Sequence, residues 1–395
     1  MLKQTPFHSR TSALMEGQAW RRWAGYAVAS AYDLVHDREY WAIRNSAALI
    51  DVSPLYKYRI TGPDAARLLD RVVTRDITTC KVHQVMYTPW CDATGKMIDD
   101  GTVSRLDEQT FRMTSADPNI RWLHDNAQGL RATIEEVSET TAALSLQGPT
   151  SRDILVELAG AAVRSLKYFH LVDATIGGVP VTVSRTGYTG DLGYELWVEA
   201  IHAERLWDAL IAVGGRYGIV PAGIWALDLA RIEAGLLMNE VDYVSARHAL
   251  IEGQKSYPFE LNLGWTVSKT KGPFVGKHSL EAERARGPAW QFVGLEVEWD
   301  SLEQLYAEVG LPPRLPTVAW RTSVPVYVGG RQVGYATSGC WSPLLKKYIA
   351  LAHLESAQST PGTRVAMEVT VEHRRKRADA RVAVTPFYNP ERKRA

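Results

Sequence analysis

Residues 178–199 contain the clearest local pattern in the chain, two strand-like segments joined by a loop with three glycines. The first strand is VPVTVSRT, the loop is GYTGDLG and the returning strand is YELWVEA. Glycine adopts backbone conformations that strain other residues, so this loop has more conformational freedom than an ordinary turn. The pattern therefore predicts an antiparallel hairpin with an oversized loop.

The glycines of this loop resemble a dinucleotide-binding fingerprint only superficially. That fingerprint requires a helix after the loop, whereas a strand follows here. The loop could let a flat ligand come close to the backbone, and an ordinary mobile hairpin tip fits the same pattern. Glu195, just inside the returning strand, could accept two N–H donors from a heterocycle.

Helical and strand-like segments alternate through most of the chain. Helical spacing predicts helices at residues 38–49, 65–73, 202–213 and 223–237. Strand-like composition predicts strands at residues 57–61, 84–91, 97–106 and 110–115, with a turn at 92–95. Asp64 is placed to cap the second helix. Because helices and strands mix in this way, we expect an α+β fold with antiparallel sheets rather than a doubly wound parallel sheet.

The chain after residue 288 is rich in strands and turns, with a short helix only near 301–308. This change of pattern predicts a separate β-barrel or β-sandwich domain. With 395 residues the chain is long enough for two or three domains, because single cores stop growing at roughly 250–300 residues. A short basic run at 372–377 is typical of a solvated strand end.

Composition excludes several classes of function. The net charge of +1 provides no overall field to attract nucleic acid or an anionic membrane. The three cysteines, Cys80, Cys91 and Cys340, form no CxxC pair, and the ten histidines show no metal-binding spacing, so we expect neither a metal site nor a disulfide framework. The chain shows neither a signal peptide nor a run of about 18 apolar residues, which favours a cytoplasmic protein.

Two adjacent carboxylates, Asp99 and Asp100, end the strand-like run that begins at Gly95. Neighbouring residues on a strand point to opposite faces, so only one of the two can face a given cavity. An aspartate in a closed pocket can accept a hydrogen bond from a substrate nitrogen or shuttle a proton. From spacing alone, two solvated charges at a strand end remain the simpler interpretation.

Ten segments spread over almost the whole chain share their order and spacing with one family. They are TPFHSR, ALIDVSPLYKYRITGPDA, GKMIDD, LSLQGPTSRDIL, SRTGYTGDLGYELWVEA, ARIEAGLL, PFELNLGWTV, FVGKHSL, GYATSGCWSPLLKKYIALA and PFYNP. Together they resemble the aminomethyltransferase family, that of the glycine cleavage T-protein. The resemblance implies a fold of the α+β class with antiparallel sheets and a C-terminal β-barrel. Its three domains are expected to form a cloverleaf around a central cavity that holds tetrahydrofolate.

The resemblance also implies domain boundaries. Residues 1–53 and 143–280 are expected to form one discontinuous α+β domain that binds folate. Residues 54–142 are expected to form a second α+β domain that carries the catalytic aspartate. Residues 288–395 are expected to form the C-terminal β-barrel.

Site residues follow from the same resemblance. The second aspartate of the family's IDD motif is its catalytic carboxylate next to folate N10, and here it is Asp100. Glu195 matches the glutamate that holds the amino-pyrimidine edge of the pterin, and Tyr87 and Tyr188 match aromatic residues that line the folate site. We expect these four side chains to converge on one cavity, with Asp100 rather than Asp99 facing inward.

Three departures from the T-protein pattern affect the expected reaction. Leu227 stands where T-proteins carry an arginine that contacts the glutamate tail of folate, and Ser115 stands where they carry an asparagine. The sequence MNEVDY at 238–243 replaces their YGxDxD segment. The change to serine resembles the family's methyltransferase branch, whose members demethylate small compounds, so we expect Ser115 on the substrate side of the cavity.

We therefore predict an enzyme that uses tetrahydrofolate as its cofactor and transfers a methyl group from a small methylated donor to its N5. The first alternative is the glycine cleavage aminomethyltransferase reaction, for which a lipoyl carrier protein would be the partner. The second is a non-catalytic folate-binding protein, although the K-G-C-Y-x-G-Q motif usual in such members is absent here. Neither nucleic acid nor a membrane is expected as a partner.

Overall fold

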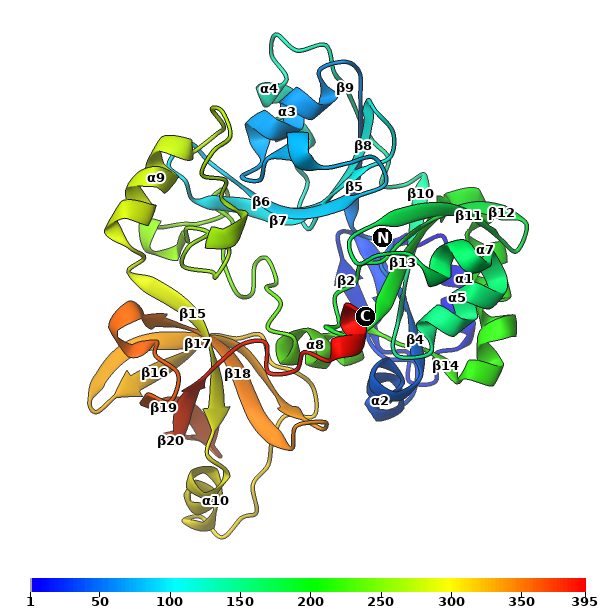
Figure 1. Cartoon of the computed structure of the whole chain (residues 1–395). Coiled ribbons are helices and arrows are strands. Elements are labelled where there is room, and N and C mark those ends of the chain that lie inside the picture. The colour runs from blue at the N-terminus through cyan, green and yellow to red at the C-terminus, as the bar shows by residue number, and fades with distance from the viewer. Residues whose placement is uncertain (1) are drawn as a thin grey trace.

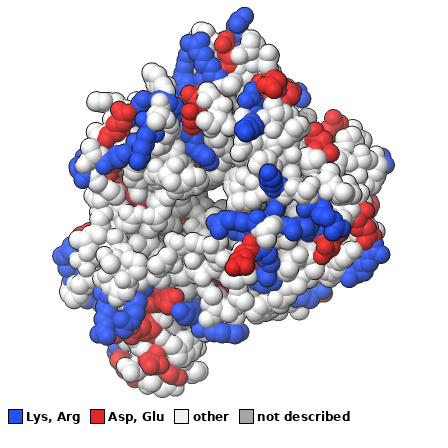
Figure 2. All heavy atoms as spheres, viewed as in Figure 1, with Lys and Arg blue, Asp and Glu red and all other residues white. Residues whose placement is uncertain are grey.

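The computed structural model describes residues 2–395, which form three sheets and a closed barrel. Figure 1 shows the three larger units, each built around its own sheet or barrel, grouped around the middle of the molecule. Figure 2 shows that the same face is hollowed near its middle. The expected α+β fold with mostly antiparallel sheets and a C-terminal barrel is confirmed.

The first unit is a six-stranded sheet with the order β11-β12-β13-β10-β4-β14. Its strands are β4 (Ala47–Asp51), β10 (Thr141–Gln147), β11 (Leu171–Ile176), β12 (Val179–Ser184), β13 (Gly193–Glu199) and β14 (Ile219–Pro221). All neighbours pair antiparallel except β14 and β4. Its helices are α1 (His8–Ala13), α2 (Asp37–Asn45), α5 (Ser151–Ala159), α6 (Ala161–Arg164), α7 (Ala203–Gly214) and α8 (Ile224–Glu233). A separate small sheet consists of β1 (Lys3–Gln4), β2 (Trp20–Trp23) and β3 (Tyr26–Ala29), and α1 lies between β1 and β2 along the chain.

The second unit is a five-stranded antiparallel sheet with the order β6-β7-β8-β5-β9. Its strands are β5 (Tyr56–Thr61), β6 (Val85–Cys91), β7 (Met97–Arg105), β8 (Thr110–Ser115) and β9 (Thr133–Glu136). Helix α3 (Ala65–Val72) buries Ala65, Leu68, Leu69 and Val72, the spacing that places apolar residues on one helical face. The second helix, α4 (Ile120–Asn126), packs against α3.

The third unit is the closed barrel, with the order β15-β18-β17-β16-β19-β20. Its strands are β15 (Trp290–Val297), β16 (Val324–Val328), β17 (Arg331–Ser342), β18 (Lys347–Glu355), β19 (Arg364–Val371) and β20 (Arg374–Ala383). Helix α9 (Lys277–Arg286) precedes the barrel, and α10 (Trp299–Ala307) follows its first strand. Closure leaves no unpaired sheet edge, so inward-facing side chains fill the interior. No helix within residues 2–395 is both long and apolar enough to cross a membrane.

Three local expectations were wrong. The helix predicted at 38–49 ends at Asn45, because residues 47–51 are fully buried and pair with strands on both sides as β4. Asp64 does not cap α3 with its side chain; its Oδ2 instead accepts the N–H of Arg131 at 2.9 Å. The helix predicted at 223–237 also stops early, at Glu233, shortly before Gly235, which has a φ of +62°. A glycine in this conformation commonly ends a helix.

We propose a division into domains close to the one expected from the sequence, because each large sheet draws its strands from one predicted domain. Strand β10 begins at Thr141, however, so a boundary at residue 143 would cut through it. We therefore place that boundary in the turn at 138–140, which lies between β9 and β10.

Candidate active site

The two adjacent aspartates of β7 have different environments. Asp99 is fully buried, and its two carboxylate oxygens accept four N–H groups. The donors are the backbone of Asp100 (2.9 Å), the backbone of Asp117 (3.0 Å) and the side-chain amides of Asn119 and Asn239 (both 3.1 Å). So many donors satisfy the carboxylate completely, which is the arrangement of a residue that holds the structure together.

Asp100 is half-buried, and two tyrosine hydroxyls hold its carboxylate. The hydroxyl of Tyr87 donates to Oδ2 at 2.8 Å, and the hydroxyl of Tyr243 donates to Oδ1. Tyr87 lies on β6 two residues from Pro89, the cross-strand partner of Asp100, so both side chains are on one face of the sheet. The carboxylate is therefore oriented by contacts from two different parts of the chain.

Burial shifts the protonation of this group. It raises the pKa of Asp100, and the hydrogen bonds from Tyr243 and Tyr87 oppose that rise by stabilising the charged form. Burial and the charge of Asp100 raise the pKa of both tyrosines, which therefore keep their protons and remain donors. Burial, and next the charge of Asp100, raise the pKa of Asp99 as well.

Asn239 links this carboxylate pair to the molecular surface. Its amide donates to Asp99 and, at 3.0 Å, to Oδ2 of Asp117. His248 Nδ1 lies 3.6 Å from Asp117 Oδ2 and 3.0 Å from Glu240 Oε1. Oδ1 of Asn239 is buried and has no partner among residues 2–395, so it is an acceptor available to a ligand.

Sequence reasoning missed Asn239 and Tyr243 as site residues. Both lie in the segment 238–243, which departs from the T-protein pattern. That departure was the one signal in the sequence that could have identified them. The contacts themselves span more than 130 positions along the chain, and no local pattern encodes them.

Tyr188 lies near the same carboxylate. It belongs to the loop between β12 and β13, and its hydroxyl donates to the carbonyl of Leu237. Both Tyr188 and Tyr87 pack against one apolar cluster, and burial raises the pKa of Tyr188 with a smaller contribution from Asp100. The structure therefore brings Tyr87 and Asp100 into direct contact and places Tyr188 close by.

Glu195 is half-buried on β13 and has its own set of neighbours. Its Oε2 accepts the hydroxyl of Thr186 at 2.5 Å. Burial raises the pKa of Glu195, whereas the hydrogen bond from Thr186 and the nearby charge of Arg112 lower it. Within residues 2–395 no hydrogen bond joins Glu195 to Asp100, so the convergence of all four predicted residues on one cavity stays a prediction.

Arg112 on β8 was not anticipated from the sequence. Its guanidinium lies 4.2 Å from the centre of the Trp197 ring, and its Nε and Nη2 are buried without partners among the described residues. Ser115 is buried at the end of the same strand, and its hydroxyl donates to the carbonyl of Asp117 at 2.6 Å. Ser115 thus stabilises the turn that presents the N–H of Asp117 to Asp99. The expected position of Ser115 on the substrate side of the cavity stays a prediction.

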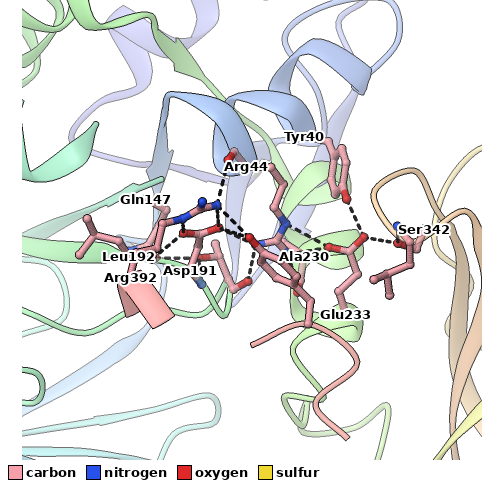
Figure 3. Close-up of polar contacts among 12 residues, drawn as sticks. Tyr40, Arg44, Gln147, Asp191, Leu192, Ala230, Glu233, Ser342 and Arg392 are labelled. Carbon is pink, nitrogen blue, oxygen red and sulfur yellow. Dashed lines mark hydrogen bonds and ion pairs between the residues drawn. The ribbon is translucent and has the colours of Figure 1, made fainter. Parts of the chain in front are cut away.

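A buried ionic network fixes the loop that carries Tyr188 (Figure 3). Arg44 on α2 donates through Nη2 to Glu233 at 2.6 Å and through Nη1 to the carbonyl of Thr189 at 3.0 Å. Its Nη1 also lies 3.4 Å from Asp191 in the same loop. Arg44, Glu233 and Asp191 have almost no exposed side-chain surface.

The same network extends to the barrel and to the C-terminal segment (Figure 3). Glu233 accepts the hydroxyls of Tyr40 at 2.6 Å and of Ser342, on β17, at 2.5 Å. Asp191 accepts two N–H groups of Arg392 at 2.6 and 2.9 Å. Arg44 and Arg392 therefore contact the loop between β12 and β13 directly, and Glu233 links Arg44 to the barrel.

Two family models match this chain. Residues 6–271 match the GCVT N-terminal domain, and residues 308–389 match the glycine cleavage T-protein C-terminal barrel domain. An aminomethyltransferase of Desulforamulus reducens is 32% identical over 99% of both chains. A trimethylamine-oxide aldolase of Ruegeria pomeroyi is 34% identical over 100% of this chain, which spans 48% of that relative's length.

A solved structure has the same fold. The crystal structure of glycine cleavage system aminomethyltransferase T from Bartonella henselae matches with a TM-score of 0.83 over 98% of this chain and 99% of that one. The two sequences are 23% identical. The likeness extends across the two sheet units and the barrel.

Proposed function

This chain belongs to the glycine cleavage T-protein family of enzymes, and we propose that it is a tetrahydrofolate-dependent one-carbon transferase that passes a methyl group from a small donor to N5 of tetrahydrofolate. The observation that carries the proposal is Asp100, a half-buried carboxylate oriented by Tyr87 and Tyr243. A group held in this way is preorganised to act on a bound ligand.

The residues near Asp100 and Glu195 fit a flat heterocycle with donors and acceptors along its edge. Glu195 offers carboxylate oxygens to N–H groups, and the unpartnered Nε and Nη2 of Arg112 offer donors to a carbonyl. Tyr87 and Tyr188 provide aromatic surface. Tetrahydrofolate, when bound, supplies a nucleophilic nitrogen that accepts the one-carbon unit.

Asp100 has two roles in this proposal. Its carboxylate accepts an N–H hydrogen bond from the bound ligand, and its negative charge stabilises positive charge that develops during transfer. Tyr87 and Tyr243 favour its ionised form and fix its direction. The buried Asp99 holds the turn at Asp117 and the amides of Asn119 and Asn239 in place around it.

The choice of a methyl donor rests on two observations. Ser115 and the segment 238–243 depart from the T-protein pattern at positions that lie around the aspartate pair. One relative bears the name trimethylamine-oxide aldolase, which indicates an N-methylated small molecule as the substrate of that protein. An N-methylated compound is therefore the first donor to test.

The aminomethyltransferase reaction is the second candidate. Several relatives that match 98–99% of this chain bear the name aminomethyltransferase, and a lipoyl carrier protein would be the partner for that reaction. Leu227 counts against it: this residue, at the position of the family's tail-binding arginine, is 6% exposed and packs in the core.

A panel of donors tests the proposal. We expect 5-methyl-tetrahydrofolate to form from at least one N-, S- or O-methylated small molecule, as measured by chromatography of the folate products. An aminomethyl-loaded lipoyl carrier protein serves as the competing substrate. Methylene-tetrahydrofolate from that carrier, with no product from any methylated donor, would favour the aminomethyltransferase reaction instead.

Glu195→Ala should weaken folate binding by about 10- to 100-fold, because a lost charge-assisted contact costs about 1.5–3 kcal/mol. Calorimetric titration with tetrahydrofolate measures the affinity. Glu199→Ala is the matched control, since Glu199 ends the same strand in an exposed position. Equal affinities for the two variants would remove Glu195 from the folate site.

A further inference from the structure

A cleft of about 500 Å³ lies at one end of the six-stranded sheet. Its walls come from α5, α6, the connection to β11, the residue after β12 and the C-terminal segment. Five cationic side chains line it: Arg152, Arg164, Lys167, Arg185 and Arg394. Figure 2 shows Lys and Arg atoms gathered in a band over the region where Figure 1 places α5 and the C-terminal end.

The positive charge of this cleft is not balanced. Within residues 2–395 no aspartate or glutamate lines the cleft, and none forms an ion pair with these five side chains. Arg152 and Arg185 donate to a hydroxyl and to main-chain oxygens, those of Tyr194, Leu166, Lys393 and Ala395. A terminal carboxylate at Ala395 would offset one of the five charges.

Arg185 is the most informative member of the group. It is only 4% exposed, and its Nε is buried with no partner among the described residues. Burial lowers the pKa of this guanidinium, the nearby Tyr194 opposes that shift, and the neighbouring charge of Arg152 adds to it. A buried cation is costly when its counter-charge is incomplete, and an anion bound in the cleft would reduce that cost.

We propose that this cleft binds a small polyanion, one that carries two or more carboxylate or phosphate groups. Its volume is in the range typical of small-molecule sites, and guanidinium groups pair with both kinds of anion in a bidentate manner. Several cations around one cleft favour a multiply charged ligand over a single anion. The proposal is independent of the one-carbon reaction, because the residues that line the cleft do not include Asp100, Tyr87, Tyr188 or Glu195.

Calorimetric titration of the full chain at low ionic strength tests this site, with tripolyphosphate and tri-L-glutamate as probes. We expect at least one probe to bind, and to bind more weakly as salt is added, because ions screen exposed charges. A preference for tripolyphosphate would indicate a phosphate ligand, and a preference for tri-L-glutamate would indicate an oligocarboxylate. Both preferences support the site.

The double variant Arg164→Glu/Lys167→Glu should weaken binding of the probe by at least about tenfold, since it replaces two positive side chains with negative ones that repel an anion. Both residues are exposed, so the fold should survive, and an unchanged melting temperature verifies this. The control Arg374→Glu/Lys269→Glu reverses one exposed arginine and one exposed lysine elsewhere and should leave the affinity within about twofold. The proposal is wrong if neither probe binds the unmodified protein at millimolar concentration, or if both double variants lose affinity equally.

Discussion

Asp100→Asn should lower turnover by roughly 10²–10⁴-fold and leave the affinity for tetrahydrofolate within several-fold of that of the unmodified protein. The amide keeps the size of the side chain and removes its negative charge. Steady-state kinetics with the donor identified in the panel gives turnover, and calorimetry gives the affinity. A turnover within tenfold of the unmodified enzyme would mean that Asp100 is not the catalytic carboxylate.

The pH dependence of Tyr243→Phe provides an independent check on Asp100. The hydroxyl of Tyr243 donates to the carboxylate and stabilises its charged form, so removing it should raise the pKa of Asp100. If the ionised form is the active one, the acidic limb of the pH–rate profile should move to higher pH. Asp100→Asn should abolish that limb, which a purely structural role for Asp100 would not do.

Arg44→Ala should lower the free energy of unfolding by about 3–5 kcal/mol, the typical cost of breaking a buried ion pair. Asp191 keeps Arg392 as a partner, whereas Glu233 loses its ion-pair partner Arg44 and remains fully buried among hydroxyls. The variant should also loosen the loop that carries Tyr188, because Arg44 donates to the carbonyl of Thr189 in that loop. Urea denaturation followed by circular dichroism measures the change.

Arg10→Ala is the matched control for Arg44. Arg10 also makes two N–H contacts with one carboxylate, that of Asp208, at 2.8 Å each, but the pair lies at the surface. Surface pairs contribute little because water competes for both partners, so this variant should leave stability nearly unchanged. A similar loss in both variants would show that burial of the Arg44 network does not determine its contribution.

Much of the fold could be predicted from short stretches of sequence. The hairpin at 178–199, the strands at 84–91 and 110–115 and the strand-rich region after residue 288 all formed as expected. These elements depend on the alternation of side chains and on turn residues within a few positions of one another. The same local basis explains one failure: residues 47–49 end a segment with helical spacing, but pairing with β10 and β14 makes them part of a strand.

The sequence alone singled out the pair Asp99 and Asp100, and its resemblance to a family favoured the second. Only the tertiary structure decided how each is used. The contacts of Asp100 with Tyr243 and of Asp99 with Asn239 join residues 143 and 140 positions apart. Likewise, Arg112 comes from another sheet to lie near Glu195, and five cations from separate segments meet in one cleft. Such groups come together only when the chain folds, because their energies depend on burial and distance, and neither quantity is local in the sequence.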